Sequence, residues 1–262
     1  MSLLDTGART GAVARINPVA KLAASAVIAL PLILTLDWVS AAVALALESV
    51  LFLFAGLSWR EFWVRTWPVW LAAPLTALTI ALYGAASGAV YLEWFVVRVS
   101  EGSLTLAVAT FFRVLAVALP SVVLFVTVDP TDLADGLAQL LRLPSRFVLG
   151  ALAGLRMAGL FLDDWRALEL ARRARGVADR GRIRRFAGMA FALLVLSIRR
   201  GSKLATAMEA RGFGAPGQRT WARPSRFGGR EWALVAAGAA ISAAAVTASV
   251  AAGTWNFILG PR

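Results

Sequence analysis

Two copies of the tripeptide Ala-Arg-Gly are the first feature whose residue types and spacing suggest a chemical role. They occupy positions 174–176 and 210–212, and each follows a stretch with the composition of a long helix. A glycine after the last helical residue adopts the left-handed conformation that ends a helix, and an arginine in the last turn complements the helix dipole. This structural role accounts for both tripeptides. The alternative is that each helix tip presents a guanidinium fork to an acidic or carbonyl-rich site on another protein.

Composition removes most catalytic chemistry. The chain of 262 residues contains no cysteine and no histidine, which excludes disulfides, thiol catalysis, His-ligated zinc and a Ser-His-Asp triad. It also lacks the pattern G-x-x-x-x-G-K-[ST], with which a P-loop holds the phosphates of ATP. We therefore expect no catalytic residue, no metal site and no cofactor in this chain.

One acidic motif leaves an enzymatic alternative. The stretch from Asp132 to Gly136 (D-x-x-D-G) is similar to the start of the metal-binding motif of CDP-alcohol phosphotransferases. That motif continues with Ala-Arg and a later D-x-x-x-D, whereas here a glutamine follows Ala138 and the aspartates at 163–164 are adjacent. A membrane enzyme of lipid synthesis is thus an alternative with an incomplete motif, and a divalent-metal-dependent transferase assay would test it.

The segments around these motifs are strongly apolar. Hydrophobic residues make up 59% of the chain, whereas soluble domains are nearer half apolar. The excess lies in blocks of about 18 residues or more, which suffice for a helix to cross the hydrocarbon core of a bilayer. We predict an all-α fold, a polytopic helical membrane protein with about five transmembrane helices and long cytoplasmic coupling helices. The spans are expected at about 20–36, 39–57, 68–84, 104–127 and 231–251.

Residues between and within the spans give local predictions. Asn17-Pro18 is a helix-start signal, because asparagine caps and proline suits the first helical position. A tight turn is expected at 37–38, and the aromatic and basic stretch 59–67 is typical of a membrane interface. Residues 89–103 suggest an interfacial helix or loop on the outer face. Arg113 lies within a predicted span, so it either pairs inside the bundle or contacts a partner subunit.

The positive charge is concentrated in one region. The net charge is +12, and residues 129–230 hold 19 Lys/Arg against 8 Asp/Glu, or +11 of it. Under the positive-inside rule this region is cytoplasmic. Five spans then place the N-terminus in the cytoplasm and the C-terminus outside. No nucleic-acid-binding module is recognisable, so we expect the bilayer surface and acidic protein surfaces as partners, and no nucleic acid.

The basic region itself is predicted to be helical. A short helix at about 131–142 precedes a long helix, capped by Ser145, that runs to about Ala174 and would measure roughly 45 Å. The first half of that helix, 147–162, is apolar nearly all round and is expected to be buried in protein or lipid. A second long helix follows at about 183–211. The chain thus divides into N-terminal spans, a coupling-helix region and a C-terminal span, at 1–128, 129–230 and 231–262.

Several motifs together resemble one known family. They are Arg15-Ile-Asn-Pro-Val-Ala-Lys-Leu, Val128-Asp-Pro-Thr-Asp-Leu-Ala-Asp, Leu143-Pro-Ser-Arg, Ala171-Arg-Arg-Ala-Arg-Gly and Ala205-Thr-Ala-Met-Glu-Ala-Arg-Gly-Phe. The chain resembles the transmembrane T component (EcfT/CbiQ-like) of energy-coupling factor (ECF) transporters over about residues 15–216. The run Ala-Met-Glu-Ala-Arg-Gly-Phe is the most specific part of the resemblance.

The resemblance implies a set of partners. Members of the family join a vitamin- or metal-capturing S component to two cytosolic ABC-type ATPase subunits, through two long coupling helices that cross beneath the membrane. The arginine of each Ala-Arg-Gly ending docks in a groove of one ATPase. The ATPase-coupling residues would be Ala174, Arg175, Gly176, Ala210, Arg211 and Gly212. Contacts with the S component would involve Asp129, Pro130, Leu133, Leu137 and Pro144.

The implied function is mechanical. The chain would lie in the cell (inner) membrane and carry ATP-driven motion to the S component for uptake of a vitamin or metal ion, while ATP and Mg²⁺ bind to the partner subunits. A stand-alone permease is the remaining alternative. Such permeases often show internal repeats with broken helices at matching positions, and this sequence shows no repeat. The sequence does not specify the substrate, because in this family the S component holds it.

Overall fold

The computed structural model describes residues 13–54, 58–84, 87–94, 97–176, 181–215 and 220–256. Their contacts divide into two compact units. The bundle unit contains the described residues up to Gly136 and those from Ser225 onward, and the two-helix unit runs from Leu137 to Pro224. The bundle unit comprises η1 (Val13–Arg15), α1 (Pro18–Leu34), α2 (Trp38–Phe54), α3 (Trp59–Tyr83), β1 (Val90–Trp94), β2 (Val97–Ser100), α4 (Glu101–Val126) and α8 (Gly229–Ala251). Helix α5 (Pro130–Gln139) begins in the bundle unit and ends in the two-helix unit, which also holds α6 (Ser145–Ala174) and α7 (Arg182–Ala210).

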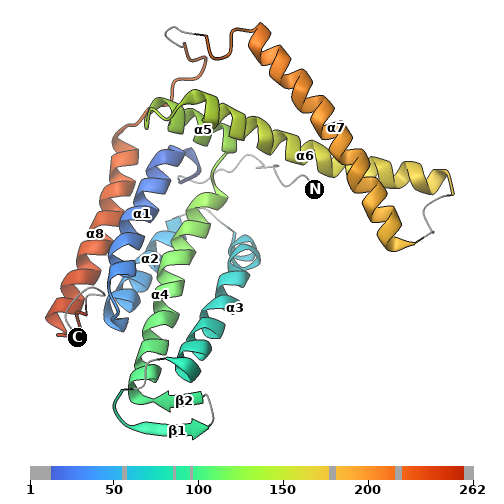
Figure 1. Ribbon diagram of the computed structural model, residues 1–262. Helices are drawn as coiled ribbons and strands as arrows, with labels where there is room; N and C mark the ends of the chain where they lie inside the picture. The colour runs from blue at the N-terminus through green and yellow to red at the C-terminus, as the bar shows by residue number, and fades with distance from the viewer. Residues whose placement is uncertain are drawn as a thin grey trace. The chain divides into compact units, whose positions relative to one another are not determined.

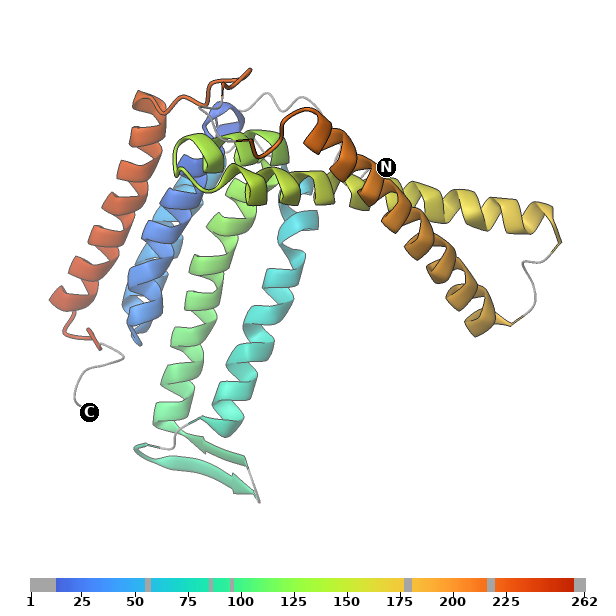
Figure 2. The ribbon, with the colours of Figure 1, turned by 45° about the horizontal axis from the view of Figure 1, so that its top comes forward.

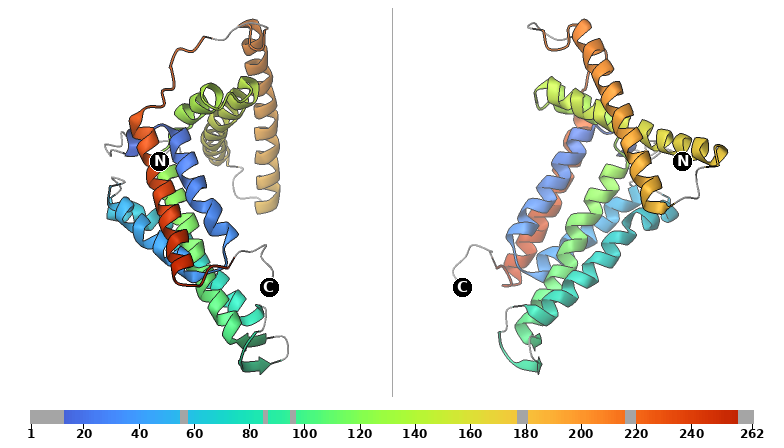
Figure 3. Two further views of the ribbon diagram at one scale, coloured as in Figure 1. Left: turned by 90° about the vertical axis from the view of Figure 1, so that its left-hand side faces the viewer. Right: turned by 45° about the vertical axis from the view of Figure 1, so that its right-hand side comes forward.

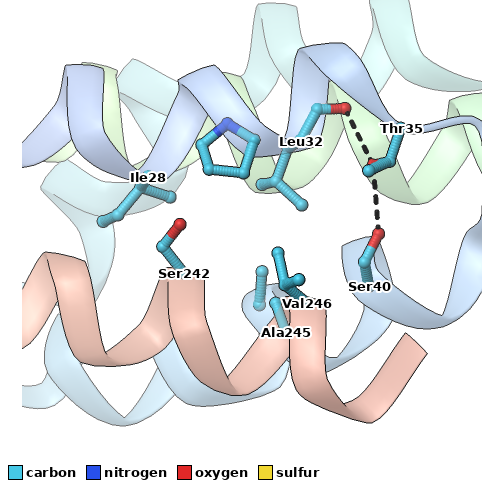
Figure 4. A pocket seen from close by; sticks show the side chains of 9 residues that line it. Ile28, Leu32, Thr35, Ser40, Ser242, Ala245 and Val246 are labelled. Atoms are coloured by element: carbon cyan, nitrogen blue, oxygen red, sulfur yellow. Dashed lines mark hydrogen bonds between the residues drawn. The ribbon is translucent and has the colours of Figure 1, made fainter. Parts of the chain in front are cut away.

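In the bundle unit, α1, α2, α4 and α8 pack together, and α3 packs along α4 (Figures 1 and 2). The core between α1 and α8 uses small residues, so that the backbones approach closely. A β carbon at Gly238 would lie 3.2 Å from the carbonyl oxygen of Ala24. Ile28 and Leu32 of α1 face Ala245 of α8 in this core (Figure 4). Close approach over small residues is the usual way in which helices associate in membranes.

Among the residues that the structure describes, four helices are long and apolar enough to cross a membrane, namely α3, α4, α6 and α8. Helices α1 and α2 are apolar but have 17 residues each. The prediction of a polytopic helical membrane protein is confirmed, and three of the five expected spans correspond to α3, α4 and α8. Helix α6 meets the same criterion of length and composition, although the sequence analysis assigned it to the cytoplasmic region.

The expected starts of α1 and α2 are confirmed. Asn17 caps α1, accepting a hydrogen bond from the N–H of Val19 at 3.0 Å, and Pro18 is the first helical residue. The tight turn before α2 depends on Asp37, which accepts hydrogen bonds from the N–H of Ser40 at 2.7 Å and from its hydroxyl at 2.9 Å. The aromatic stretch at the start of α3 begins with a capping box between Ser58 and Glu61. Local capping chemistry thus fixes where these helices begin.

Three local predictions are wrong. Residues 90–94 and 97–100 pair as the antiparallel strands β1 and β2, rather than forming a helix or loop, because β-branched and aromatic side chains favour extended backbone. Ser145 is the first residue of α6 and not its cap; Pro144 holds the cap position without a side-chain hydrogen bond. Helix α5 ends at Gln139 rather than near 142, since Arg142 has a positive φ of 52° that no helix accommodates.

Arg113 is bonded within the bundle. Its Nη2 donates a hydrogen bond to the carbonyl oxygen of Thr35, just after α1. This agrees with the first of the two alternatives for a buried arginine in a span. A cationic group in the bilayer needs such a partner, since an unpaired charge there is costly. Thr35 also lies 3.3 Å from the hydroxyl of Ser40, which ties the end of α1 to the start of α2 (Figure 4).

Candidate functional site

The first Ala-Arg-Gly tripeptide forms the end of α6. Arg175 is the C-cap residue, and its N–H donates to the carbonyl oxygen of Ala171 at 3.3 Å. Gly176 follows with φ +66°, and its N–H donates to the carbonyl oxygen of Arg173 at 3.0 Å. A side chain at position 176 would be strained in this left-handed conformation. The glycine therefore has the helix-ending role that the sequence predicts.

The second tripeptide forms the end of α7 in the same way. Arg211 is the C-cap residue, and Gly212 has φ +74°. The N–H of Gly212 donates to the carbonyl oxygen of Glu209 at 2.9 Å, and the N–H of Phe213 donates to that of Met208, also at 2.9 Å. These two bonds are the pair that defines a Schellman motif. Both tripeptides thus share one geometry, in which an arginine is held at the tip of a rigid helix.

The arginines at the two tips are exposed, and neither the guanidinium of Arg175 nor that of Arg211 makes a hydrogen bond or ion pair with a residue that the structure describes. The exposed Arg184 and Arg199 of α7 are alike in this, whereas Arg173 and Arg185 pair with Glu169, and Arg200 pairs with Asp164. The N–H donors of the tip arginines remain available, in a planar arrangement that suits carboxylates and carbonyl groups.

Helices α6 and α7 cross, and ion pairs hold the crossing (Figures 1 and 3). Both guanidinium nitrogens of Arg200 contact the carboxylate of Asp164, one of them at 3.0 Å. Trp165 and Phe186 pack with their ring centroids 5.5 Å apart. Met189 of α7 is only 1% exposed. Polar and apolar contacts together thus hold the two helices against each other at the crossing.

Gly188 contributes to the same crossing. A β carbon there would lie 3.0 Å from Nη2 of Arg172, so the missing side chain makes room for that guanidinium. Figure 3 shows that the C-terminal ends of α6 and α7, which carry the tripeptides, lie apart from each other in the crossed pair. The two tips therefore present two distinct arginine sites rather than one.

Much of the remaining surface of this unit is apolar. Residues 147–162 are expected to be buried in protein or lipid; within the chain itself most of them are exposed or half-exposed, so their burial by lipid or a partner stays a prediction. Phe147 is 78% exposed, Ile183 86% and Phe191 68%. Apolar surface of this extent normally marks contact with protein or membrane. We define the exposed apolar surface of α6 and α7 by Phe147, Leu155, Leu160, Leu162, Leu170, Ile183, Phe186, Phe191, Leu194, Val195 and Ile198.

The predicted S-component contacts fall into both units. In the bundle unit, Asp129 caps α5 by accepting from the N–H of Thr131 at 2.7 Å, and Pro130 and Leu133 follow in that helix. In the two-helix unit, the carbonyl oxygen of Leu137 accepts from the N–H of Leu143 at 3.1 Å, and Pro144 is exposed. The five residues thus do not form one site within either unit, and their contact role stays a prediction. The same is true of the ATPase-coupling role of the six tripeptide residues.

The structure also places the acidic motif of the enzymatic alternative. Asp132 and Asp135 lie in α5. Within the described ranges, no group of three or more acidic side chains is close enough to hold a metal ion. The transferase assay remains the test of this alternative.

One cluster of contacts was not predicted from the sequence. Asn17, expected only as a helix cap, also donates from Nδ2 to the hydroxyl of Ser225 at 2.8 Å and to the carbonyl oxygen of Arg226 at 3.0 Å. Its N–H donates to Glu231 at 3.2 Å. Two features of the sequence could have indicated these contacts. One is the glycine at position 136, inside α5. The other is the glutamate three residues after Gly228, which is the spacing of a capping box.

These features define a multi-pass helical membrane protein with a crossed helix pair whose tips carry exposed arginines. The sequence model of the CbiQ family, described as "Cobalt transport protein", matches residues 11–221. The chain belongs to this family.

Curated relatives share the larger part of the chain. The energy-coupling factor transporter transmembrane protein EcfT of Limosilactobacillus fermentum is 28% identical over 183 residues, which cover 63% of this chain and 68% of the relative. EcfT of Lacticaseibacillus paracasei is 30% identical over 183 residues, 65% and 67% of the two chains. EcfT of Streptococcus equi is 25% identical over 219 residues, 79% and 81%. The resemblance to a T component of the EcfT/CbiQ kind is confirmed, and these relatives are named as transport components rather than as enzymes.

Proposed function

We propose that this chain is the coupling subunit of an ECF-type ABC importer. In this proposal it connects two cytosolic ABC-type ATPases, which bind ATP and Mg²⁺, to a membrane S component that captures a vitamin or a metal ion. The observation that carries the proposal is the pair of exposed arginines that two equivalent Ala-Arg-Gly turns hold at the ends of α6 and α7. Family membership agrees with it, since the relatives are named energy-coupling factor transporter proteins.

The tips are suited to docking. Each of Arg175 and Arg211 is held at the end of a helix of about 30 residues, 30 in α6 and 29 in α7. A helix that ends in a fully bonded turn transmits displacement of its tip along its length with little bending. Closure of the two ATPases would displace the tips. Because the ion pairs at the crossing hold α6 and α7 together, the displacement would turn the pair as a unit, which is the discrete rearrangement that coupling over distance needs.

The exposed apolar surface of α6 and α7 supports the second half of the proposal. A surface with residues as exposed as Ile183 and Phe191 requires a cover. In this proposal the S component covers part of it and lipid the rest. Residues 129–230 lie on the cytoplasmic side, as their excess of basic residues indicates, and the N-terminus is cytoplasmic.

Paired substitutions test the proposal. Arg175→Ala with Arg211→Ala removes both tip guanidiniums and leaves the crossing untouched. Arg184→Ala with Arg199→Ala is the matched control, because it removes the same charge from exposed positions of α7 away from the tips. Each variant is co-expressed with its ATPases and S component, and co-purification and substrate uptake are measured.

We expect the tip variant to insert in the membrane and to lose both ATPase co-purification and uptake, while the control keeps both. Wild-type uptake by the tip variant would refute the proposal. Co-purification of the wild-type chain without any ATPase would instead favour the stand-alone permease.

A further inference from the structure

Within the described residues, the chain passes between its two units at two points. It leaves the bundle unit after Gly136 and returns at Ser225. Displacement of the two-helix unit can reach the spans along the chain through these two connections. Both of them, on their bundle side, lie against the first turn of α1. We call the residues that meet there, all of the bundle unit, the junction: Asn17, Val19, Gly136, Ser225 and Glu231.

The returning connection is bonded to Asn17. The Nδ2 of Asn17 donates to the hydroxyl of Ser225 at 2.8 Å and to the carbonyl oxygen of Arg226 at 3.0 Å. Glu231 bonds to the same residues: one carboxylate oxygen accepts a hydrogen bond from the N–H of Asn17 at 3.2 Å, and the other accepts one from the N–H of Gly228 at 2.9 Å. The starts of α1 and α8 are thereby fixed to the same short stretch of backbone.

The outgoing connection packs against the same asparagine. Gly136 is buried within α5, where a glycine is unfavourable compared with alanine. A β carbon at this position would lie 2.7 Å from Cγ2 of Val19, 3.2 Å from Oδ1 of Asn17 and 3.6 Å from Oγ of Ser225. A side chain here would require the side chain of Val19 or the helix itself to shift. The glycine therefore allows both connections to meet at one place.

A buried lysine secures the segment just before α5. Lys21 lies one turn beyond Asn17 in α1 and is 1% exposed. Its Nζ donates to the hydroxyl of Thr127 at 2.8 Å and to the carbonyl oxygen of Thr127 at 3.2 Å. Since Thr127 follows α4 directly, α4 is tied to the same end of α1. Three spans, α1, α4 and α8, thus share the point where both connections arrive.

We propose that the junction is the positioning site through which displacement of the two-helix unit reaches the spans. This inference rests on the proposed function. Asn17 and Gly136 touch neither tip arginine, so they are positioning residues and not ATPase contacts. If the junction loosens, the ATPases still dock and hydrolyse ATP, but their motion no longer moves α1, α4 and α8 together, and transport per ATP falls.

Three graded substitutions separate the junction from simple stability. Asn17→Asp keeps the oxygen that caps α1 and removes the amide donor to Ser225 and Arg226. Ser225→Ala removes the hydroxyl that accepts from that amide. Gly136→Val is the strongest change, because it adds bulk where a β carbon already collides. Gly150→Ala is the matched control: this glycine lies in α6, and a β carbon there would meet nothing within 4 Å.

The experiment uses the complete transporter in liposomes and measures ATP hydrolysed per substrate molecule imported, together with ATPase co-purification. We expect Asn17→Asp and Gly136→Val to keep the ATPases bound and to raise the ATP-to-substrate ratio by about fivefold or more, the low end of known coupling effects. Ser225→Ala should raise it less, and Gly150→Ala should leave it unchanged. A wild-type ratio for both Asn17→Asp and Ser225→Ala overturns the inference, even if Gly136→Val fails to fold.

Failure of the two proposals looks different. If the wild-type chain recruits no ATPase, the proposed function is wrong. If the wild-type chain recruits the ATPases and imports substrate but the Asn17→Asp and Ser225→Ala variants couple normally, only the junction is wrong.

Discussion

The left-handed glycine at the end of α7 allows a test of tip geometry that leaves Arg211 itself in place. Gly212 has φ +74°, and the Schellman bonds around it fix the direction in which Arg211 points. Replacement by alanine makes this conformation unfavourable by about 1–2 kcal/mol. If ATPase docking needs the native turn, that cost appears in binding, as an increase of about 5- to 30-fold in the dissociation constant.

A glycine-to-alanine substitution in the interior of α7 should stabilise the helix rather than destabilise it. Gly201 lies inside α7, and a β carbon there would meet nothing within 4 Å. Alanine at this position favours the helix by about 1 kcal/mol, so Gly201→Ala should bind the ATPase as well as the wild type does. Gly212→Asn is the partial rescue, because asparagine tolerates the left-handed conformation better than alanine.

The assay is a titration of purified ATPase against the detergent-solubilised chain, with thermal unfolding of each variant as the stability control. We expect affinities in the order wild type, Gly212→Asn, Gly212→Ala, with Gly201→Ala equal to the wild type. Equal affinity of Gly212→Ala and Gly212→Asn to the wild type would refute the reasoning that tip geometry controls docking.

Two further predictions concern the interior of each unit. A double-mutant cycle on Asp164 and Arg200 should give a coupling free energy of about 1 kcal/mol in thermal or denaturant unfolding, because the helix crossing partly shields this pair. The exposed pair Asp163–Arg166 should give a smaller coupling free energy. Equal values for the two pairs would contradict the importance of the crossing. Glu48 is fully buried, lines a cavity of about 80 Å³, and neither carboxylate oxygen accepts a hydrogen bond from a described residue. Glu48→Met should therefore stabilise the bundle by about 1–3 kcal/mol in thermal unfolding, and a destabilised variant would show that the carboxyl has a partner.

The helix ends were predictable because their causes are local. Asn17-Pro18 starts α1, and glycines at 176 and 212 end α6 and α7, each through bonds within a few residues in sequence. The apolar blocks likewise predicted α3, α4 and α8 by length alone. Where local preference and tertiary context compete, prediction was poorer: the mixed residues near Tyr91 pair as a hairpin, a result that depends on the partner strand and not on the segment itself.

The junction could not be predicted for a different reason. Asn17 and Ser225 are 208 positions apart, so no periodicity or local spacing joins them. Capping of α1 was a sufficient local explanation for the asparagine, so its hydrogen bonds to residues near Ser225 were not expected. Gly136 inside a helix was a signal, but a helical glycine does not reveal which neighbour needs the space. The pairing of Asp164 with Arg200, between two helices, was hidden in the same way.

The closeness of the two connections has an evolutionary consequence. Because the chain departs at Gly136 and returns at Ser225 beside the same asparagine, residues 137–224 form an excursion whose ends almost meet. Segments with adjacent ends are the ones that proteins exchange or lengthen without rebuilding the host. Changes of length or sequence within residues 137–224 should therefore leave the bundle unit intact, provided that the small residue at 136 and the amide at 17 are kept.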